Sequence, residues 1–360
     1  MTDAATRGRV GLAARYARVR RVAVRSPTRI AAARAVAQTG RRLEAVVSVL
    51  FDSPSGPRAV ESCFLVGAPR SGTTFLAKAL GQHPAVCFSK PKETHFFVRD
   101  CLELPPERWA AEFQRRYFPH FEERHRTIAE GSPLQLRDPR AIENLLRFDP
   151  DTRLLIAVRN PADMAYSLHA RLVYLLDEDE RDFRRAWALQ EARARGERIP
   201  RRCRDPQSLQ YRDFCAVGAQ LERLFGQIDR RRVHVMVFDD LVGDTVKTYR
   251  GLLEFLGLPD DGRTAFDRKN ENREYRHAWA QAYVTNPPKP LASLLESWQR
   301  KGKGRPTWMR RIRRRVKQWN TRKAKRAPLA ADLRAELQAA FAPDVERLEH
   351  LLGRDLSHWR

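Results

Sequence analysis

The segment Gly67–Thr74, which reads Gly-Ala-Pro-Arg-Ser-Gly-Thr-Thr, constrains the fold of this chain more than any other feature. It has the G-x-x-x-x-G spacing of a phosphate-binding loop, and it lies between the apolar run Cys63–Val66 and an amphipathic helical pattern. In such a loop the backbone N–H groups and the positive end of the helix dipole face an anion, and glycine allows close approach. The segment therefore predicts a phosphate or sulfate site formed by Arg70, Ser71, Gly72, Thr73 and Thr74.

The second half of this loop differs from the loop of ATP- and GTP-using enzymes. In those enzymes a lysine and then a serine or threonine follow the second glycine. Here Thr73 stands where the lysine would be, and the nearest cation is Arg70. An acidic pair that could bind Mg²⁺, Asp239 and Asp240, follows one of the strand candidates. A P-loop small-molecule kinase thus stays as an alternative, while the missing lysine favours another anionic nucleotide.

Short apolar runs and helical patterns alternate along the chain. This order predicts an α/β, P-loop-type three-layer fold with a central, mostly parallel sheet flanked by helices. The expected strands are Cys63–Val66, Val86–Phe88, Thr127–Ala129, Arg153–Arg159 and Val233–Phe238. The expected helices are Thr73–Gln82, one opened by Asn160 and Pro161, Thr245–Leu258, and one or two within 328–352.

Polar side chains follow two of these strands at the edge where a parallel sheet binds ligands. Glu93 comes shortly after Val86–Phe88, and its carboxylate could take a proton from an attacking group. Arg159 ends the strand candidate Arg153–Arg159, and its guanidinium suits a phosphate. Ser167 lies eight residues further on, in the helix that Pro161 opens. We expect Glu93 to face the Gly67–Thr74 loop and Arg159 to lie at the same edge of the sheet.

Over about residues 60–258 the chain resembles the sulfotransferases that use 3′-phosphoadenylyl sulfate (PAPS), and most of all the heparan-sulfate-type carbohydrate sulfotransferases and their bacterial relatives. The motifs that carry the resemblance are Pro-Arg-Ser-Gly-Thr-Thr74, Lys92-Glu-Thr-His-Phe-Phe97 and Arg159-Asn-Pro-Ala-Asp-Met-Ala-Tyr-Ser167. The resemblance implies that the first motif holds the 5′-phosphosulfate. It implies that Arg159 and Ser167 hold the 3′-phosphate, that Glu93 is the base, and that Lys92 and His95 line the donor or acceptor site.

We therefore expect an enzyme that moves a sulfuryl group from PAPS to a hydroxyl or amine of a carbohydrate or glycolipid, with Arg70 stabilising the transfer and no metal. Transfer would be in line, with positioning and charge stabilisation supplying most of the catalysis. The product would be adenosine 3′,5′-bisphosphate. A non-catalytic binder of anionic polymers or membranes on the same fold is a further alternative. This chain departs from the family's pattern at Gly131, where many relatives carry a lysine. The third donor contact could lie at 301–305 or 272–276.

The formal net charge of +24 is concentrated in two segments. Residues 1–50 hold eleven arginines and two acids, and residues 301–327 hold thirteen Lys or Arg and no acid. We expect a basic arm and linker over 1–58, the linker being 51–58, and a sulfotransferase domain over 59–360. Within 301–327, Met309, Ile312, Val316 and Trp319 share one helical face among cations.

A basic amphipathic helix of this kind is typical either of contact with an anionic membrane or polymer, or of a solvated surface. The sequence has no apolar run of membrane-spanning length and no secretory signal, and its five scattered cysteines do not have the spacing of a zinc site. We expect a cytoplasmic protein, peripheral to the inner face of the membrane, with no specific nucleic-acid partner.

Overall fold

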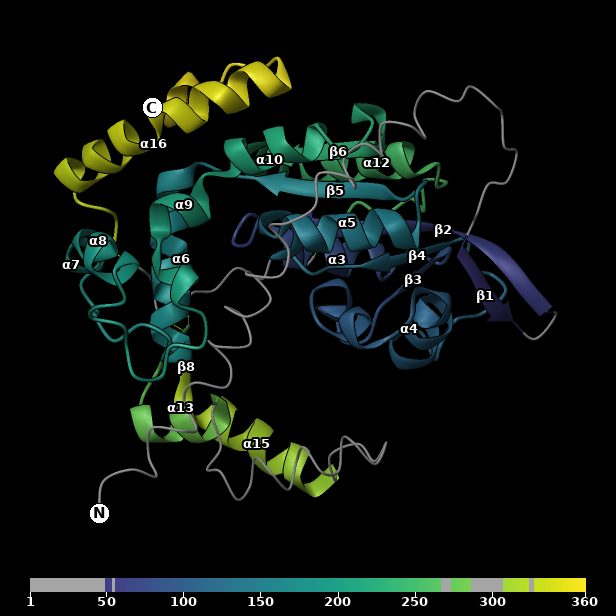
Figure 1. Cartoon of the computed structure of the whole chain (residues 1–360), viewed down its shortest axis with the longest axis horizontal. Coiled ribbons are helices and arrows are strands. Elements are labelled where there is room, and N and C mark those ends of the chain that lie inside the picture. The colour runs from purple at the N-terminus through teal and green to yellow at the C-terminus, as the bar shows by residue number, and fades with distance from the viewer. Residues whose placement is uncertain (1–48, 54–55, 267–272, 286–306, 324–326) are drawn as a thin grey trace, which may run out of the picture. The chain divides into compact units, whose positions relative to one another are not determined.

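The central sheet of the computed structural model contains five parallel strands in the order β3-β4-β2-β5-β6 (Figure 1). The structure describes residues 49–53, 56–266, 273–285, 307–323 and 327–360. The strands of this sheet are β2 (Gly56–Gly67), β3 (Val86–Phe88), β4 (Thr127–Glu130), β5 (Arg153–Val158) and β6 (Val233–Val237). Each includes or matches a strand predicted from the sequence, and the parallel pairing confirms the predicted α/β class.

Helices connect these strands and form the C-terminal part of the chain (Figure 1). In chain order they are α3 (Thr73–Leu80), α4 (Trp109–Tyr117), α5 (Pro139–Phe148), α6 (Pro161–Leu175), α7 (Phe183–Ala188), α8 (Gln190–Ala194), α9 (Tyr211–Cys215), α10 (Val217–Phe225), α11 (Phe238–Gly243), α12 (Thr245–Leu256), α13 (Ala278–Thr285), α15 (Thr307–Asn320) and α16 (Ala331–Leu352). The helices predicted from the sequence are confirmed, and residues 331–352 form one helix that contains Pro343.

Two hydrophobic cores lie on opposite faces of the sheet. In β5, Leu155 and Ala157 belong to the core that α3 and α12 cover. Leu154, Ile156 and Val158 belong to the other core, which α5, α6 and α10 cover. This alternation is what a strand buried on both faces requires, because successive side chains point to opposite sides. The three layers predicted from the sequence are therefore present.

The first strand of the chain forms a hairpin with the sheet. β1 (Val49–Ser53) pairs antiparallel with the first part of β2, with Ser53 opposite Gly56. The prediction of a linker over 51–58 is therefore wrong. Phe51 is fully buried, and its ring packs edge-on against Phe118 and Phe121 at centroid distances of 5.5 and 5.4 Å. These aromatic contacts hold the hairpin to the domain. The basic arm predicted before it lies almost wholly outside the described residues.

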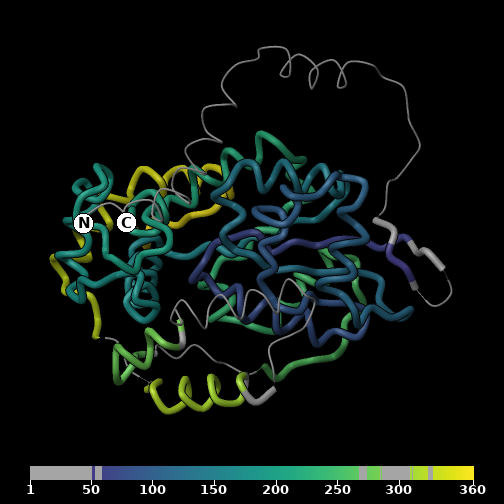
Figure 2. The backbone as a smooth tube through the Cα atoms, turned by 60° about the horizontal axis from the view of Figure 1, so that its bottom comes forward, coloured from purple at the N-terminus to yellow at the C-terminus, as the bar shows by residue number. Residues whose placement is uncertain are grey.

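Side chains fix the starts of the helices that follow the sheet. Asn160 accepts a hydrogen bond from the N–H of Ala162 at 3.0 Å and caps α6, with Pro161 at the first helical position. Asp344 of α16 accepts from the N–H groups of Gly218 and Ala219, both at 2.9 Å, and so caps α10 from another helix. Figure 2 shows the yellow α16 alongside this part of the chain.

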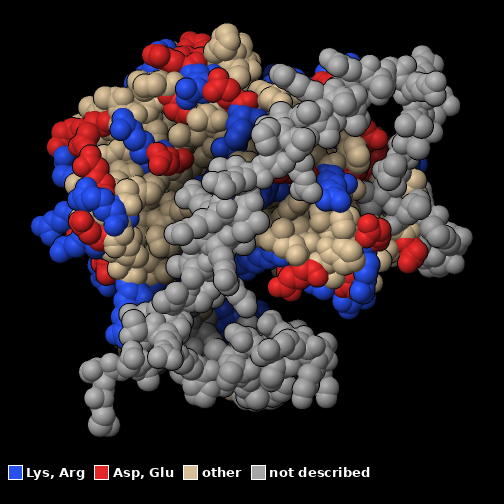
Figure 3. All heavy atoms as spheres, in the orientation of Figure 1, with Lys and Arg blue, Asp and Glu red and all other residues tan. Residues whose placement is uncertain are grey.

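The carboxyl ends of all five parallel strands meet at one edge of the sheet. β2 lies in the middle, with β4 on one side and β5 on the other, so the connections leaving its end and the end of β4 run in opposite directions. Such a point is where open α/β sheets bind ligands. On the face drawn in Figure 3, cations and acids of the described residues are interspersed. Among the described helices, none is long and apolar enough to cross a bilayer.

Candidate active site

The loop after β2 has the backbone geometry of an anion site. Gly72 is the N-cap of α3 with a φ of 95°, and a Cβ atom there would lie 3.0 Å from Cδ2 of Leu241. Glycine is therefore required for both the backbone conformation and the space. No side chain in the described part of the protein caps α3, so its first N–H groups are available to a ligand. Ser71 is buried with its Oγ toward Met164, which leaves its backbone rather than its hydroxyl for that role.

The structure brings the predicted 3′-phosphate residues to this loop. The Nε of Arg70 donates a hydrogen bond to the Oγ of Ser167 at 2.9 Å. An Nη1–H of Arg159 donates to the backbone oxygen of Arg70 at 3.3 Å. The structure therefore brings Arg70, Arg159 and Ser167 together beside the loop.

Arg159 is a cation in a mostly buried position. Its guanidinium lies over the ring of Phe238, 4.6 Å from the centroid, and the nearest carboxylate oxygen, on Asp163, is 3.9 Å away. Burial lowers the pKa of Arg159, and the carboxylates of Asp163 and Asp239 act in the opposite direction. A guanidinium so placed gains from a further anion, because a buried charge without close compensation is costly.

The other side of the loop contacts the predicted base segment. The Nζ of Lys92 donates to Glu93 Oε1 at 3.1 Å and to the Oγ1 of Thr73 at 3.5 Å. The carboxylate of Glu93 is 47% exposed, so an acceptor can reach it. His95 Nε2 lies 4.0 Å from Glu93 Oε2, and burial followed by the charge of Arg99 lowers the pKa of His95. His95 is therefore placed beside the carboxylate as a neutral imidazole at neutral pH.

Sequence reasoning missed how Lys92 and Gly131 are related. A Cβ atom at Gly131 would lie 3.2 Å from Cε and 3.5 Å from Cγ of Lys92. The stem of Lys92 thus occupies the space beside position 131, and the N–H of Gly131 donates to the backbone oxygen of Lys92 at 3.1 Å. An ammonium group reaches the phosphate loop from Lys92 although position 131 has no side chain. Lys92 and Gly131 lie in loops that are far apart in the sequence, so no local sequence pattern could have revealed their contact.

Glu130, at the end of β4, was also missed by sequence reasoning, and its hydrogen bonds hold the segment that follows Glu93. Its fully buried carboxylate accepts from the N–H and hydroxyl of Thr94 at 3.0 and 3.1 Å, and from the N–H and hydroxyl of Ser132. The Oγ of Ser132 in turn accepts from the N–H of His95 at 3.1 Å. Burial raises the pKa of Glu130 to about 7, against the hydrogen bonds from Ser132 and Thr94, which lower it.

The acidic pair after β6 is bound by the C-terminal segment. The Oδ2 of Asp239 accepts from the indole N–H of Trp359 at 2.7 Å and lies 3.0 Å from His358 Nε2. Asp240 forms a two-pronged ion pair with Arg354. Burial is small around Asp240, and its bond with Arg354 lowers its pKa. Both carboxylates thus have a structural role, which removes the feature that favoured the kinase alternative.

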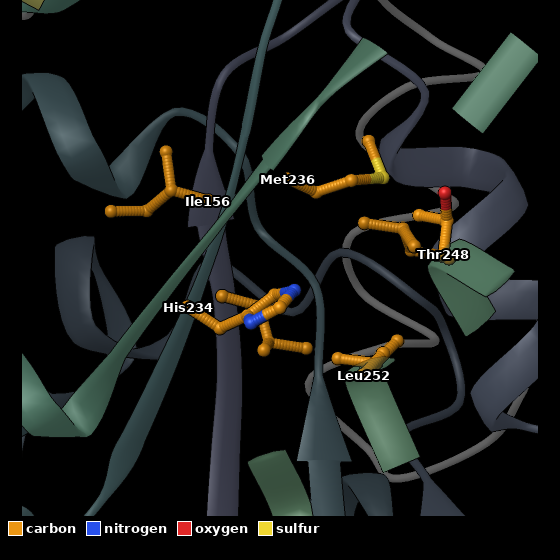
Figure 4. Close-up of a pocket in the computed structure, with 7 residues that line it drawn as sticks. Ile156, His234, Met236, Thr248 and Leu252 are labelled. Carbon is orange, nitrogen blue, oxygen red and sulfur yellow. The ribbon is translucent and has the colours of Figure 1, made fainter. Parts of the chain in front are cut away.

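A small apolar gap inside the domain is unrelated to this site. It lies between β5, β6, α3 and α12, and Figure 4 shows Ile156, His234, Met236, Thr248 and Leu252 around it. The lining residues of β5 and β6 lie within the strands rather than at their carboxyl ends. We interpret it as imperfect packing of the core under α3.

The third donor contact is expected at one of two places, 301–305 or 272–276. Residues 301–305 and Asn272 lie outside the described residues. Arg273–Tyr275 form a short strand, β7, that pairs with β8 (Thr321–Lys323). The hydroxyl of Tyr275 accepts from Arg181 at 3.1 Å, so this strand is engaged with the loop after α6.

Comparisons with known proteins concern the family and the fold of this chain rather than the individual residues of the site. The family model described as "Sulfotransferase domain" matches residues 61–326. The crystal structure of a sulfotransferase from Alicyclobacillus acidocaldarius is 27% identical with a TM-score of 0.56, covering 84% of this chain and 100% of that chain. No curated protein matches this chain.

Two solved structures are similar at a lower level. The sulfotransferase domain from the Synechococcus PCC 7002 olefin synthase is 16% identical, with a TM-score of 0.36, over 82% of this chain and 96% of that chain. Mouse sulfotransferase SULT7A1 complexed with PAP is 17% identical, with a TM-score of 0.33, over 56% of this chain and 60% of that chain.

Proposed function

The chain belongs to the sulfotransferase family, and on that premise we propose that it transfers a sulfuryl group from PAPS to a hydroxyl or amine of an acceptor. One observation carries the proposal: a continuous row of side chains crosses the carboxyl edge of the sheet. Ser167 contacts Arg70 on one side of the phosphate loop at 2.9 Å. Lys92 contacts Thr73 on the other side at 3.5 Å and Glu93 at 3.1 Å. These contacts connect the residues proposed to bind the two anionic groups of the donor with the proposed base, Glu93.

The residues of this edge fit a donor with two separate anionic groups. The uncapped start of α3, with the N–H groups of Ser71 to Thr74, suits the 5′-phosphosulfate. Arg159 supplies a half-buried guanidinium, and Ser167 a hydroxyl, for the 3′-phosphate. PAPS, when bound, supplies a sulfuryl group whose S–O bond to the 5′-phosphate breaks during transfer.

We assign the proton and charge movements to three side chains. Glu93 takes the proton of the acceptor hydroxyl as the new O–S bond forms. Lys92 and Arg70 stabilise the negative charge that develops on the departing phosphate oxygen. In many relatives a lysine stands where this chain has Gly131. Lys92 takes the role of that lysine here, because its stem fills the space beside Gly131.

We propose a carbohydrate or glycolipid as the acceptor, as in the heparan-sulfate-type enzymes that the motifs resemble, and action at the cytoplasmic face of the membrane. The exposed carboxylate of Glu93 supports a bulky acceptor, since a large substrate can approach it without entering a deep cavity.

Transfer of labelled sulfate from PAPS to glycans and lipids of the source cell tests the proposal. We expect Glu93→Gln to reduce transfer by about 10²- to 10⁴-fold while binding of adenosine 3′,5′-bisphosphate is unchanged. Glu122→Gln is the matched control, because Glu122 is an exposed carboxylate paired with Arg124 rather than with Lys92. Unchanged transfer in Glu93→Gln would remove Glu93 from the mechanism, and label moving from ATP instead would refute sulfuryl transfer.

A further inference from the structure

A strongly cationic unit extends from the far end of α6. It consists of α13, α15 and the β7–β8 ribbon, and Figure 1 shows α13 and α15 together at that end of the helix. Residues 273–285 and 307–323 carry ten Lys or Arg and one acid, Glu274. Glu274 is already paired with Arg322 at 2.6 Å. Within these described residues, cations therefore outnumber acids by ten to one.

Polar contacts hold this unit to α6 in one orientation. The Nε2 of Gln281 donates to the backbone oxygen of Tyr174 at 2.7 Å, and the Tyr174 hydroxyl lies 2.9 Å from Thr321 Oγ1. Asn320 accepts from the N–H of His277 at 2.8 Å and donates to its backbone oxygen at 3.1 Å. Gln281 and Asn320 are both buried. These contacts fix which faces of α13 and α15 are turned toward α6 and which are turned away from it.

Large apolar side chains cover the faces that are turned away. Trp279 is 69% exposed, Trp319 50% and Ile312 46%. The ring of Trp319 lies 6.2 Å from that of Trp279 and stacks on His277 at 5.2 Å. This is a cluster rather than a scatter of single exposed residues, and such clusters mark contact surfaces.

The apolar and cationic side chains share one stripe of α15. Ile312, Arg315 and Trp319 are spaced i, i+3 and i+7, which places them on the same helical face, and Arg311 lies one turn before Arg315. All four are exposed. The face predicted to be apolar, Met309 to Trp319, is therefore only half covered, and its open half is edged with arginines.

We propose that the stripe Arg311, Ile312, Arg315 and Trp319, together with Trp279, docks on the surface of a membrane containing anionic lipids. Arginines suit the lipid phosphates, while tryptophan suits the headgroup level and isoleucine the acyl boundary. A soluble anionic polymer would use the cations alone and would leave Ile312 and Trp279 in water. The charge and the exposed apolar area together favour the bilayer.

The helix α6 links the anchor of this unit to the donor site, which bears on a lipid-linked acceptor. Ser167, in the donor site, and Tyr174, which anchors the unit, are seven residues apart on α6, which is about 10 Å along a helix. That consequence rests on the proposed function. The docking itself does not, since no residue of the stripe belongs to the donor site.

Sedimentation of the full chain with vesicles tests the docking, using phosphatidylcholine alone and phosphatidylcholine with phosphatidylglycerol. We expect binding to the anionic vesicles, and a loss of about tenfold or more in Ile312→Ser/Trp279→Ser, which keeps every charge. Leu102→Ser/Val242→Ser is the matched control, because it removes two exposed apolar side chains elsewhere. The control should bind as the unchanged protein does.

A second measurement separates insertion from charge attraction by the other basic segments. Brominated acyl chains should quench tryptophan fluorescence in the unchanged protein, and Trp279→Phe/Trp319→Phe should lose that quenching. Equal vesicle binding by the stripe and control variants, or equal quenching in both proteins, would overturn the proposal. Affinity for adenosine 3′,5′-bisphosphate should be the same in all variants, so a failed docking experiment leaves the proposed transfer untouched.

Discussion

The Nε of Arg70 donates a hydrogen bond to the Oγ of Ser167 across 2.9 Å, although 97 residues separate them in the chain. The bond ties the loop after β2 to the helix after β5, two strands that are neighbours in the sheet. We predict that Ser167→Ala weakens binding of adenosine 3′,5′-bisphosphate by about three- to tenfold, the usual range for one hydrogen bond.

A double-mutant cycle checks this prediction by calorimetric titration. Because the two side chains contact each other, the effects of Arg70→Ala and Ser167→Ala should not add. Strict additivity would show that the two residues act on the ligand independently.

The relation between Lys92 and Gly131 predicts that the ammonium group can be moved. Lys92→Ala should lower the rate of sulfuryl transfer by about 10²-fold, the cost of removing one charge-stabilising donor, with little change in nucleotide affinity. Gly131→Lys in that background should recover part of the lost rate, because removing the stem of Lys92 leaves only the ring of Phe88, 3.3 Å from the added Cβ atom, to shift slightly.

Steady-state kinetics of the single and double variants provide the measurement. Lys90→Ala is the control, since Lys90 is an exposed lysine just before the same segment. A Lys92→Ala enzyme as fast as the control would exclude Lys92 from the transfer step.

Glu130 should give the stability of the protein a particular pH dependence. Its pKa is raised by burial from 4.5 to about 7 in the folded protein. Between these two values the folded state binds more protons than the unfolded state, so the contribution of this group to stability falls as pH rises through that window.

We predict that the stability difference between the unchanged protein and Glu130→Gln shifts by about 3 kcal/mol between pH 4.5 and pH 7, to the disadvantage of the unchanged protein at the higher pH. Urea unfolding at a series of pH values measures it. Parallel stability curves would mean that Glu130 is not buried as a titrating group.

Gly72 should not tolerate a side chain. Gly72→Ala would place a Cβ atom at a φ of 95° and 3.0 Å from Leu241, so we expect a loss of about 1 to 2 kcal/mol of stability and weaker nucleotide binding. Gly251→Ala, within α12 and with nothing within 4 Å of the added atom, should instead stabilise the protein by about 0.5 to 1 kcal/mol. Thermal unfolding of the two variants compares them, and equal effects would contradict the strained geometry of the loop.

The five parallel strands could be predicted from the sequence because each is a short apolar run bounded by turn residues or a loop. The place of Arg159 could be predicted for the same reason: once the sheet is parallel, the residue that follows β5 lies at its ligand-binding edge. The contact of Ser167 with Arg70 needs the structure, because Ser167 lies within α6 rather than at the end of a strand.

What could not be predicted depends on contacts between distant segments. The turn residues Ser53, Pro54, Ser55 and Gly56 predict a linker, whereas the pairing of β1 with β2 and the burial of Phe51 against Phe118 show a strand before them. Glu130 has no local pattern that reveals its partners. The indole N–H of Trp359 donates to Asp239, 120 positions away in the chain. Asp239 and Asp240 suggested metal binding in the sequence, but in the structure they bind the C-terminal segment.

The central claim is that this edge of the sheet holds a nucleotide with a 3′-phosphate. Calorimetric titration with adenosine 3′,5′-bisphosphate, adenosine 5′-phosphate and ATP with Mg²⁺ tests it most directly, in the unchanged protein and in Arg159→Gln. We predict that the bisphosphate binds at least about tenfold more tightly than the monophosphate, and that Arg159→Gln abolishes this preference. Equal affinity for the two adenosine nucleotides, or tighter binding of ATP with Mg²⁺, would contradict the claim.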